Sequence, residues 1–82
     1  MRNEDKRLSP RQKAEDILID VSWQSIAHRY FGKSSSWFYH KFNERDVNGT
    51  GVPYKFTDKE LEILKGGLCD LAKRIRKVAD TL

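Results

Sequence analysis

The chain has 82 residues, of which 38% are hydrophobic and 34% are charged, and its formal net charge is +4. This length predicts one small domain over 1–82, and the mild basic excess suits a polyanionic partner such as nucleic acid. The single cysteine, Cys69, excludes an internal disulfide. No apolar run approaches the roughly 18 residues of a membrane-spanning helix, and the start lacks an apolar secretory signal, so we expect a cytoplasmic protein without a membrane partner.

The beginning of the chain predicts a flexible terminus followed by a helix. Residues 1–8 are polar and of mixed charge, which is typical of a frayed end. Ser9 then provides an N-cap, Pro10 suits the first helical position, and Gln12 stands three residues after the cap. The apolar spacing that follows predicts a helix over 10–20.

The stretch 22–43 holds both tryptophans, two of the three tyrosines and three of the four phenylalanines, and it has no acidic residue. Ser22 can cap a second helix, predicted over 23–31, whose apolar side chains form one stripe. Gly32 is placed to end this helix in the left-handed conformation. The stretch therefore begins with a short helix that stops at a tight turn.

A serine cluster opens a third helix, predicted over 35–43. Phe38 and Phe42 are four residues apart on this helix and face the core. The aromatic side chains of the stretch are mostly expected in the core. Tyr39 is the exception and is expected at the surface.

The segment 44–56 predicts the main loop, because asparagine, glycine and proline interrupt it. Asn48-Gly49 has the composition of a two-residue hairpin turn, but its flanks are too short and polar to predict strands. Thr57 and Glu60 then form a capping box. They begin the C-terminal segment 57–82, which predicts one long helix over about 58–80.

Apolar residues of this last helix alternate four and three apart, which is a heptad pattern. They are Leu61, Leu64, Leu68, Leu71, Ile75, Val78 and Leu82. The stripe either packs on the first three helices or pairs in part with a second copy in a homodimer. Gly66-Gly67 interrupts it at a cost of roughly 1 kcal/mol per glycine relative to alanine, so we expect a neighbour packed closely there.

The predicted fold is therefore all-α: a small helical domain with a helix-turn-helix-like unit at 22–43 and a long C-terminal helix. Ile26-Ala27, Gly32 and the run from Ser34 to Phe42 resemble the helix-turn-helix of bacterial and phage regulators. In that superfamily the glycine usually follows the alanine by four residues, whereas Gly32 follows Ala27 by five. The first helix of the pair is therefore expected to be one residue longer.

A second resemblance covers more of the chain. The run WQSIAHRYFGKSSSWFYHKFN, followed by a turn and FTDKELEILKGGLCDLAKRIRKVAD, is similar to a family of small uncharacterised proteins from gut Bacteroidales. That family is a domain of unknown function. The resemblance supports the unity of the fold and implies no activity.

The outer face of helix 35–43 carries polar side chains that suit DNA. Serine, asparagine and histidine can hydrogen-bond base edges, and hydroxyl groups suit phosphate oxygens. The predicted DNA-binding residues are Arg29, Lys33, Ser34, Ser36, Tyr39, His40, Lys41 and Asn43. We expect a non-enzymatic DNA-binding protein, either a small transcriptional regulator or an accessory factor of a phage or mobile element, with helix 35–43 in the major groove.

The rival hypothesis is a protein-interaction module that uses the same helical unit and the heptad helix without nucleic acid. The positions of the cations discriminate between the two. Alignment of Arg29, Lys33 and Lys41 on one face with Tyr39 and His40 favours DNA, and their scatter favours the interaction module.

Other chemistry finds little support in the sequence. Gly32-Lys33-Ser34 imitates the end of a phosphate-binding loop, but Ala27 stands where that motif needs a glycine. His28 and His40 have no neighbouring cysteine or paired acids, so we expect no metal site and no cofactor. The serines near His40 are explained by helix capping, and no catalytic residue is predicted.

Overall fold

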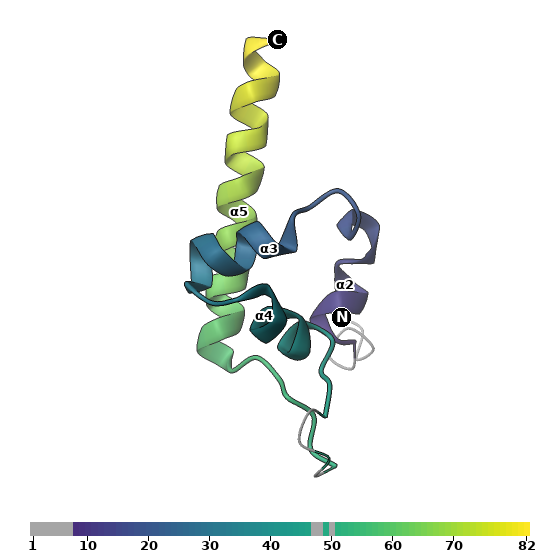
Figure 1. The fold of residues 1–82 in the computed structure, drawn as a ribbon. Coiled ribbons are helices and arrows are strands. Elements are labelled where there is room, and N and C mark those ends of the chain that lie inside the picture. The colour runs from purple at the N-terminus through teal and green to yellow at the C-terminus, as the bar shows by residue number, and fades with distance from the viewer. Residues whose placement is uncertain (1–7, 47–48, 50) are drawn as a thin grey trace.

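The computed structural model describes residues 8–46, 49 and 51–82. In this part of the chain the protein consists of helices without a strand, which confirms the predicted all-α class (Figure 1). In order, the elements are α2 (Pro10–Lys13), the 3₁₀-helix η1 (Glu15–Ile17), α3 (Trp23–Ile26), the π-helix η2 (Ala27–Phe31), α4 (Ser35–Phe42) and α5 (Asp58–Thr81). The predicted flexible terminus lies outside the described residues except for Leu8, and so does Asn48 of the predicted turn.

The long helix α5 begins at the predicted capping box. The Glu60 N–H donates to Thr57 Oγ1 at 3.1 Å, and the Thr57 N–H donates to Glu60 Oε1 at 2.9 Å. The helix runs without a break through both glycines to Thr81. Its first half packs beside the other helices, and its second half extends beyond them (Figure 1).

The core is an aromatic cluster shared by α3, α4 and the first half of α5. Its buried side chains are Trp23, Ile26, Ala27, Phe38, Phe42, Phe56 and Leu64. Ring centroids lie 4.7 Å apart for Trp23 and Phe42, and 5.0 Å apart for Phe38 and Phe42. The expectation that the aromatics of 22–43 form the core is confirmed, and Phe56 joins them from the segment predicted as a loop.

The first helix is shorter than predicted. Its capping box is confirmed, because the Ser9 N–H donates to Gln12 Oε1 at 2.8 Å and the Gln12 N–H donates to Ser9 Oγ at 3.2 Å. A continuous helix over 10–20 is wrong, however: α2 ends at Lys13 and a 3₁₀ turn follows. The Trp23 indole N–H donates to the Leu18 carbonyl at 2.8 Å and stabilises this bent connection, whose apolar side chains pack on the core.

The second helix has the predicted bounds, because α3 and η2 together cover 23–31. It ends at Gly32, which adopts the predicted left-handed conformation with φ 65°. The Lys33 N–H bonds to the Ala27 carbonyl and the Gly32 N–H to the His28 carbonyl, both at 3.2 Å. Each bond reaches one residue farther back than in a standard Schellman ending. The extra residue between Ala27 and Gly32 is therefore absorbed as a π-turn.

Tyr30 of η2 packs against α5 at the second of its two glycines. A Cβ atom on Gly67 would lie 2.8 Å from the Tyr30 ring, whereas a Cβ on Gly66 would meet nothing within 4 Å. The predicted close neighbour is thus confirmed at Gly67. Because Gly67 has no side chain, the Tyr30 ring can lie directly against the backbone of α5, and η2 packs close to that helix.

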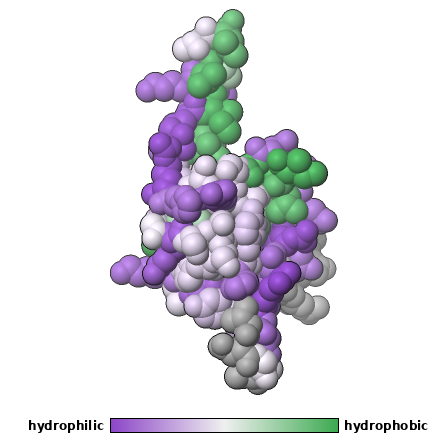
Figure 2. Space-filling view, in the orientation of Figure 1, coloured by the Kyte–Doolittle hydropathy of each residue, from purple (hydrophilic) through white to green (hydrophobic). Residues whose placement is uncertain are grey.

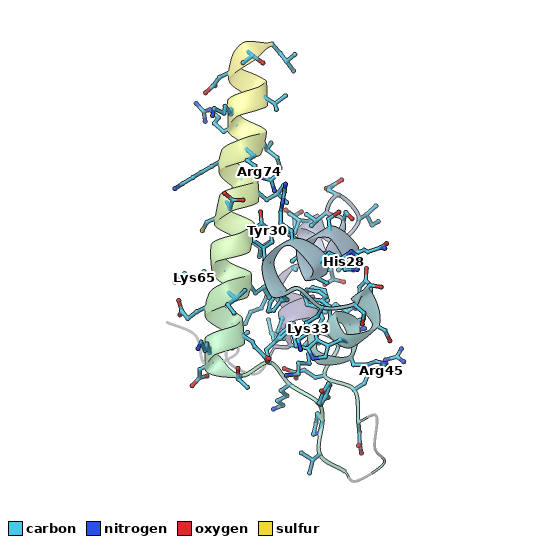
Figure 3. All side chains as sticks on the ribbon, turned by 60° about the vertical axis from the view of Figure 1, so that its left-hand side comes forward. His28, Tyr30, Lys33, Arg45, Lys65 and Arg74 are labelled. Atoms are coloured by element: carbon cyan, nitrogen blue, oxygen red, sulfur yellow. The ribbon has the colours of Figure 1, made fainter. Side chains whose placement is uncertain are left out.

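A polar cluster extends this contact along α5. The Tyr30 hydroxyl donates to Asp70 Oδ2 at 2.5 Å, while Arg74 donates from Nη2 to the Tyr30 oxygen at 2.9 Å and from Nε to Asp70 at 3.2 Å. Figure 3 shows Tyr30 and Arg74 directed toward each other between α5 and the body. The Tyr30 hydrogen bond and Arg74 lower the pKa of the Asp70 carboxyl.

Candidate nucleic-acid interface

Helix α4 is anchored by one face and exposes the other. Its cap is Ser34, whose Oγ accepts from the Trp37 N–H at 3.1 Å, and its bounds agree with the prediction to within one residue. Phe38 and Phe42 are 0% and 1% exposed, so the inner face is fixed in the core. The outer face is consequently held rigidly at the surface.

Besides Lys41, four of the predicted DNA-binding residues lie from position 36 to position 43, and the structure separates them into two pairs. Ser36 and Tyr39 are exposed, whereas His40 and Asn43 are half-buried. The Tyr39 ring stands edge-on to Phe38, with centroids 5.9 Å apart. The Asn43 side-chain oxygen is buried without a hydrogen-bond partner among the described residues. Ser36 and Tyr39 are thus the most accessible of the four.

The expectation that Lys41 adds positive charge at the surface is wrong. Lys41 is only 8% exposed, and its Nζ lies 2.7 Å from Glu60 Oε1. The same ammonium group lies 5.0 Å from the centroid of the Trp37 ring and 4.9 Å from that of Tyr54. Its charge is neutralised by a carboxylate, and its ammonium group also stands over two aromatic rings. Lys41 therefore supports the packing of α4 on α5.

The carboxylate partner of Lys41 responds to this arrangement. Burial alone would raise the pKa of Glu60, but hydrogen bonds from Lys41 and the Thr57 backbone outweigh it and hold the pKa below its ordinary value of 4.5. Glu60 thus joins the cap of α5 to the last turn of α4. The pair is a structural link between the two helices.

The other two predicted cations are exposed but lie apart. Lys33 stands in the turn before α4, with its Nζ 5.6 Å from the centroid of the Trp37 ring. Arg29 lines a surface cavity between η2 and α5, together with Leu71 and Arg74. Arg29, Lys33 and Lys41 therefore do not align on one face. Such scatter favours the protein-interaction module, so these three cations do not support the DNA-binding hypothesis.

Two arginines that the sequence did not suggest lie near the end of α4. Arg11 and Arg45 line a polar surface cavity together with Asn43 and the acidic Glu44. The position of Arg45 is fixed by a Schellman ending of α4, in which its N–H bonds to the His40 carbonyl at 2.9 Å. Nothing in the local sequence indicates that the start of α2 carries Arg11 to this place.

The revised candidate interface, here called the α4 surface, consists of the exposed and half-buried polar residues along α4 and the cations at its two ends. Its members are Arg11, Lys33, Ser34, Ser36, Tyr39, His40, Asn43 and Arg45. The stretch 33–43 contains no acidic residue. Figure 3 shows Lys33 and Arg45 on the part of the body that carries α4, and Lys65 on the other side of α5.

The described residues contain no group of three or more His, Cys, Asp or Glu side chains that could hold a metal ion. Cys69 is a free thiol at the surface of α5. Within the same residues, no helix is both long and apolar enough to cross a lipid bilayer.

The fold defines a small all-α domain in which two short helices and a left-handed glycine turn pack against one long helix. The chain belongs to the family Domain of unknown function (DUF5053), which covers residues 10–82 and so includes every helix from α2 to α5. This confirms the predicted resemblance to a domain of unknown function. No curated protein and no solved structure matches the chain.

Proposed function

We propose that the chain is a non-enzymatic DNA-binding domain that acts in the cytoplasm, as a small transcriptional regulator or as an accessory factor of a phage or mobile element. In this proposal α3, η2 and α4 act as a helix-turn-helix. Helix α4 enters the major groove, and the protein binds as a homodimer through α5. Residues of the α4 surface make the contacts.

The observation that carries the proposal is the character of the outer face of α4. It presents exposed Ser36 and Tyr39, it lacks acidic residues along its length, and it has Lys33 before its start and Arg45 after its end. Cations at both ends of a helix can hold the phosphates on the two sides of a groove while short polar side chains meet the bases between them. The π-turn supports the assignment as well, because it leaves Gly32 at the turn despite the extra residue.

The division of roles follows from exposure. Lys33 and Arg45 neutralise phosphates, and Arg11 lies near Arg45 in the same surface cavity. Ser36 and Tyr39 reach base edges or phosphate oxygens. Neutralising even a few phosphates makes the affinity fall with salt, with a slope in log–log terms of about −0.9 per phosphate.

A negative charge placed on the exposed face of α4 tests the proposal. Ser36→Glu adds an acid to the first turn of α4, where a negative charge favours the helix, so the fold is retained. Cys69→Glu makes the same charge change at an exposed position of α5. Both are titrated into labelled duplex DNA at about 50 mM salt. The expected result is binding by the wild type and Cys69→Glu and a loss of at least about tenfold for Ser36→Glu.

Absence of wild-type binding at low salt would contradict the proposal, and so would equal losses for the two variants. Circular dichroism of each variant establishes that the helices are retained. Because the titration reports DNA binding alone, it can fail whether or not the chain forms dimers.

The second candidate function is a protein-interaction module without nucleic-acid binding. The observation that favours it is the free half of α5, where Ile75 and Val78 are 58% and 59% exposed. The scatter of Arg29, Lys33 and Lys41 points the same way. Failure of DNA binding together with retained association through α5 would select this function.

A further inference from the structure

The apolar stripe of α5 continues beyond the body of the molecule. Leu64 is buried and Leu68 and Leu71 are packed against the core, whereas Ile75 is 58% and Leu82 fully exposed on the same stripe. Figure 2 shows hydrophobic surface along this projecting part of α5. An exposed apolar face on an amphipathic helix is typical of an interaction site.

We propose that the partner is a second copy of the chain, and that residues 71–82 of the two copies pair as antiparallel helices. This deepens the dimer of the proposed function by assigning its orientation and register. The pairing does not require DNA binding. Two observations support the antiparallel pairing. The first is where the body of each copy lies, and the second is which residues lie beside the apolar contact between the two helices, here called the seam.

The place of the body on α5 fixes the orientation of the pair. The body contacts α5 through Leu64, Leu68 and Leu71, so it lies on the same side of the helix as the exposed part of the stripe. Packed helices lie about 8–10 Å apart. In a parallel pair both bodies would therefore occupy one level between the two helices and collide. In an antiparallel pair they lie at opposite ends.

The antiparallel register pairs every apolar residue of the projecting half. Ile75 of one copy lies opposite Val78 of the other, and Leu71 lies opposite Leu82, so the seam has four apolar layers. Such a/d layers are the usual core of paired helices. The two-fold axis passes midway between positions 75 and 78.

The flanks of this seam hold no opposing like charges. On one side Ala72 meets Ala79 of the second copy, and both are exposed in the single chain. On the other side Arg74 meets the uncharged Thr81. Small alanines allow close approach of the helices. The remaining cations, Lys73, Arg76 and Lys77, occupy positions outside the seam.

This distribution favours a second helix over a lipid surface. A helix that lies in a membrane interface places cations beside its apolar face, where they meet anionic headgroups. Here the four flanking positions hold two alanines, one threonine and one cation, which is Arg74. The other three cations of this segment, Lys73, Arg76 and Lys77, lie outside the seam. Arg74 is also held by Asp70 and Tyr30.

The length of the overlap sets the strength of the dimer. From Leu71 to Leu82 the helix rises about 16 Å. So short a contact is smaller than the stable interfaces of roughly 1,200–2,000 Å², which use about 20–30 residues on each side. We therefore expect a dimer that dissociates on dilution through the micromolar range.

The same geometry separates the two bodies. Leu64 of one copy and Leu64 of the other are about 25 helical residues apart along the shared axis, which corresponds to about 37 Å. Half-sites read by helix-turn-helix dimers are about 34–36 Å apart. Along the shared axis, the separation of the two bodies is therefore similar to that of such half-sites.

Sedimentation equilibrium over a concentration series tests the association. The wild type is expected to move from the chain mass of 9.6 kDa to twice that value as concentration rises. Val78→Asp is expected to remain monomeric, whereas Cys69→Asp, an equal charge change outside the seam, is expected to dimerise as the wild type does. Val78 is exposed in the single chain, so its variant keeps the fold.

Cross-linking tests the orientation in a Cys69→Ser background. Ala72→Cys mixed with Ala79→Cys is expected to give a covalent dimer with a short bis-maleimide. Leu82→Cys alone is expected to give none, because the two copies of position 82 lie about 16 Å apart along the axis. Efficient linking of Leu82→Cys to itself, with no product from the mixture, would overturn the antiparallel pairing.

Two further outcomes would overturn the proposal. One is a wild type that stays monomeric at every concentration, and the other is undiminished association of Val78→Asp. Vesicles containing phosphatidylserine provide the last comparison. If the wild type were monomeric and bound these vesicles while Val78→Asp did not bind them, a lipid surface and not a second copy would cover this face.

Discussion

The ring of Tyr30 lies directly against Gly67, so a methyl group at that position would stand 2.8 Å from two ring carbons. Gly67→Ala must therefore push the ring or the helices apart. We expect this variant to lower the free energy of unfolding by about 1–3 kcal/mol, as overpacking usually does. Urea denaturation followed by circular dichroism measures the change.

The adjacent glycine provides the control. Gly66 faces open space in the interior of the same helix, so Gly66→Ala gains helix propensity without a clash. It should raise the free energy of unfolding by about 0.5–1 kcal/mol. Equal effects of the two substitutions would contradict the close packing of Tyr30 on Gly67.

The ion pair of Lys41 and Glu60 predicts a pH dependence of stability. The pKa of Glu60 is lower in the folded protein than its ordinary value of 4.5. Its contribution to stability is therefore fully present above pH 4.5 and is lost as the pH falls through the lowered pKa. We expect the wild type to be more stable than Glu60→Gln at pH 7, and the difference to shrink below pH 4.5.

The difference between wild type and Glu60→Gln is the useful quantity, because Asp70 also has a lowered pKa and titrates in the same direction. Asp70 is common to both proteins, so its effect cancels. Chemical denaturation at a series of pH values measures the difference. A difference that stayed constant from pH 7 to pH 3 would contradict the proposed link between α4 and α5.

The ending of α4 predicts a stabilising substitution. Glu44 has φ 54° at the left-handed position of the Schellman motif, where glycine is preferred. Glu44→Gly should raise the free energy of unfolding by about 0.5–1 kcal/mol, since relief of backbone strain exceeds the entropy gained by the unfolded chain. Asn43→Gly, at φ −88°, should give no gain. A loss of stability in Glu44→Gly would show that the side chain has a role at this position.

Most of the helices could be predicted because their signals are local. Ser9 and Gln12, like Thr57 and Glu60, form capping boxes within four residues of chain, and the structure contains both. Gly32 ends its helix for an equally local reason. The heptad stripe likewise predicted α5 correctly to within one residue of its end.

The errors arose where distant parts of the chain meet. Helix propensity over 10–20 could not reveal that the Trp23 indole binds the Leu18 carbonyl. Phe56 has no periodic neighbours in sequence, yet its ring lies 5.7 Å from that of Phe31. Such contacts depend on how the helices pack.

In the candidate site, too, the features set by local sequence were predicted correctly and those set by distant contacts were not. The exposure of Tyr39 was predicted from a helical wheel and is confirmed at 38%. Lys41 was misplaced because its carboxylate partner lies 19 residues away. Its spacing of four from Trp37 was the local signal that could have indicated stacking of the two side chains.

In the proposed complex, DNA binds along α4 through the cations at its two ends. The most direct measurement is the salt dependence of the affinity for duplex DNA, compared for wild type, Lys33→Ala/Arg45→Ala and the charge-matched Lys65→Ala/Lys73→Ala. The first double variant should bind more weakly, with a log–log slope shallower by about 2 for each bound chain, and the second should keep the wild-type slope. Equal slopes for the two double variants, or no wild-type binding at low salt, would contradict the account.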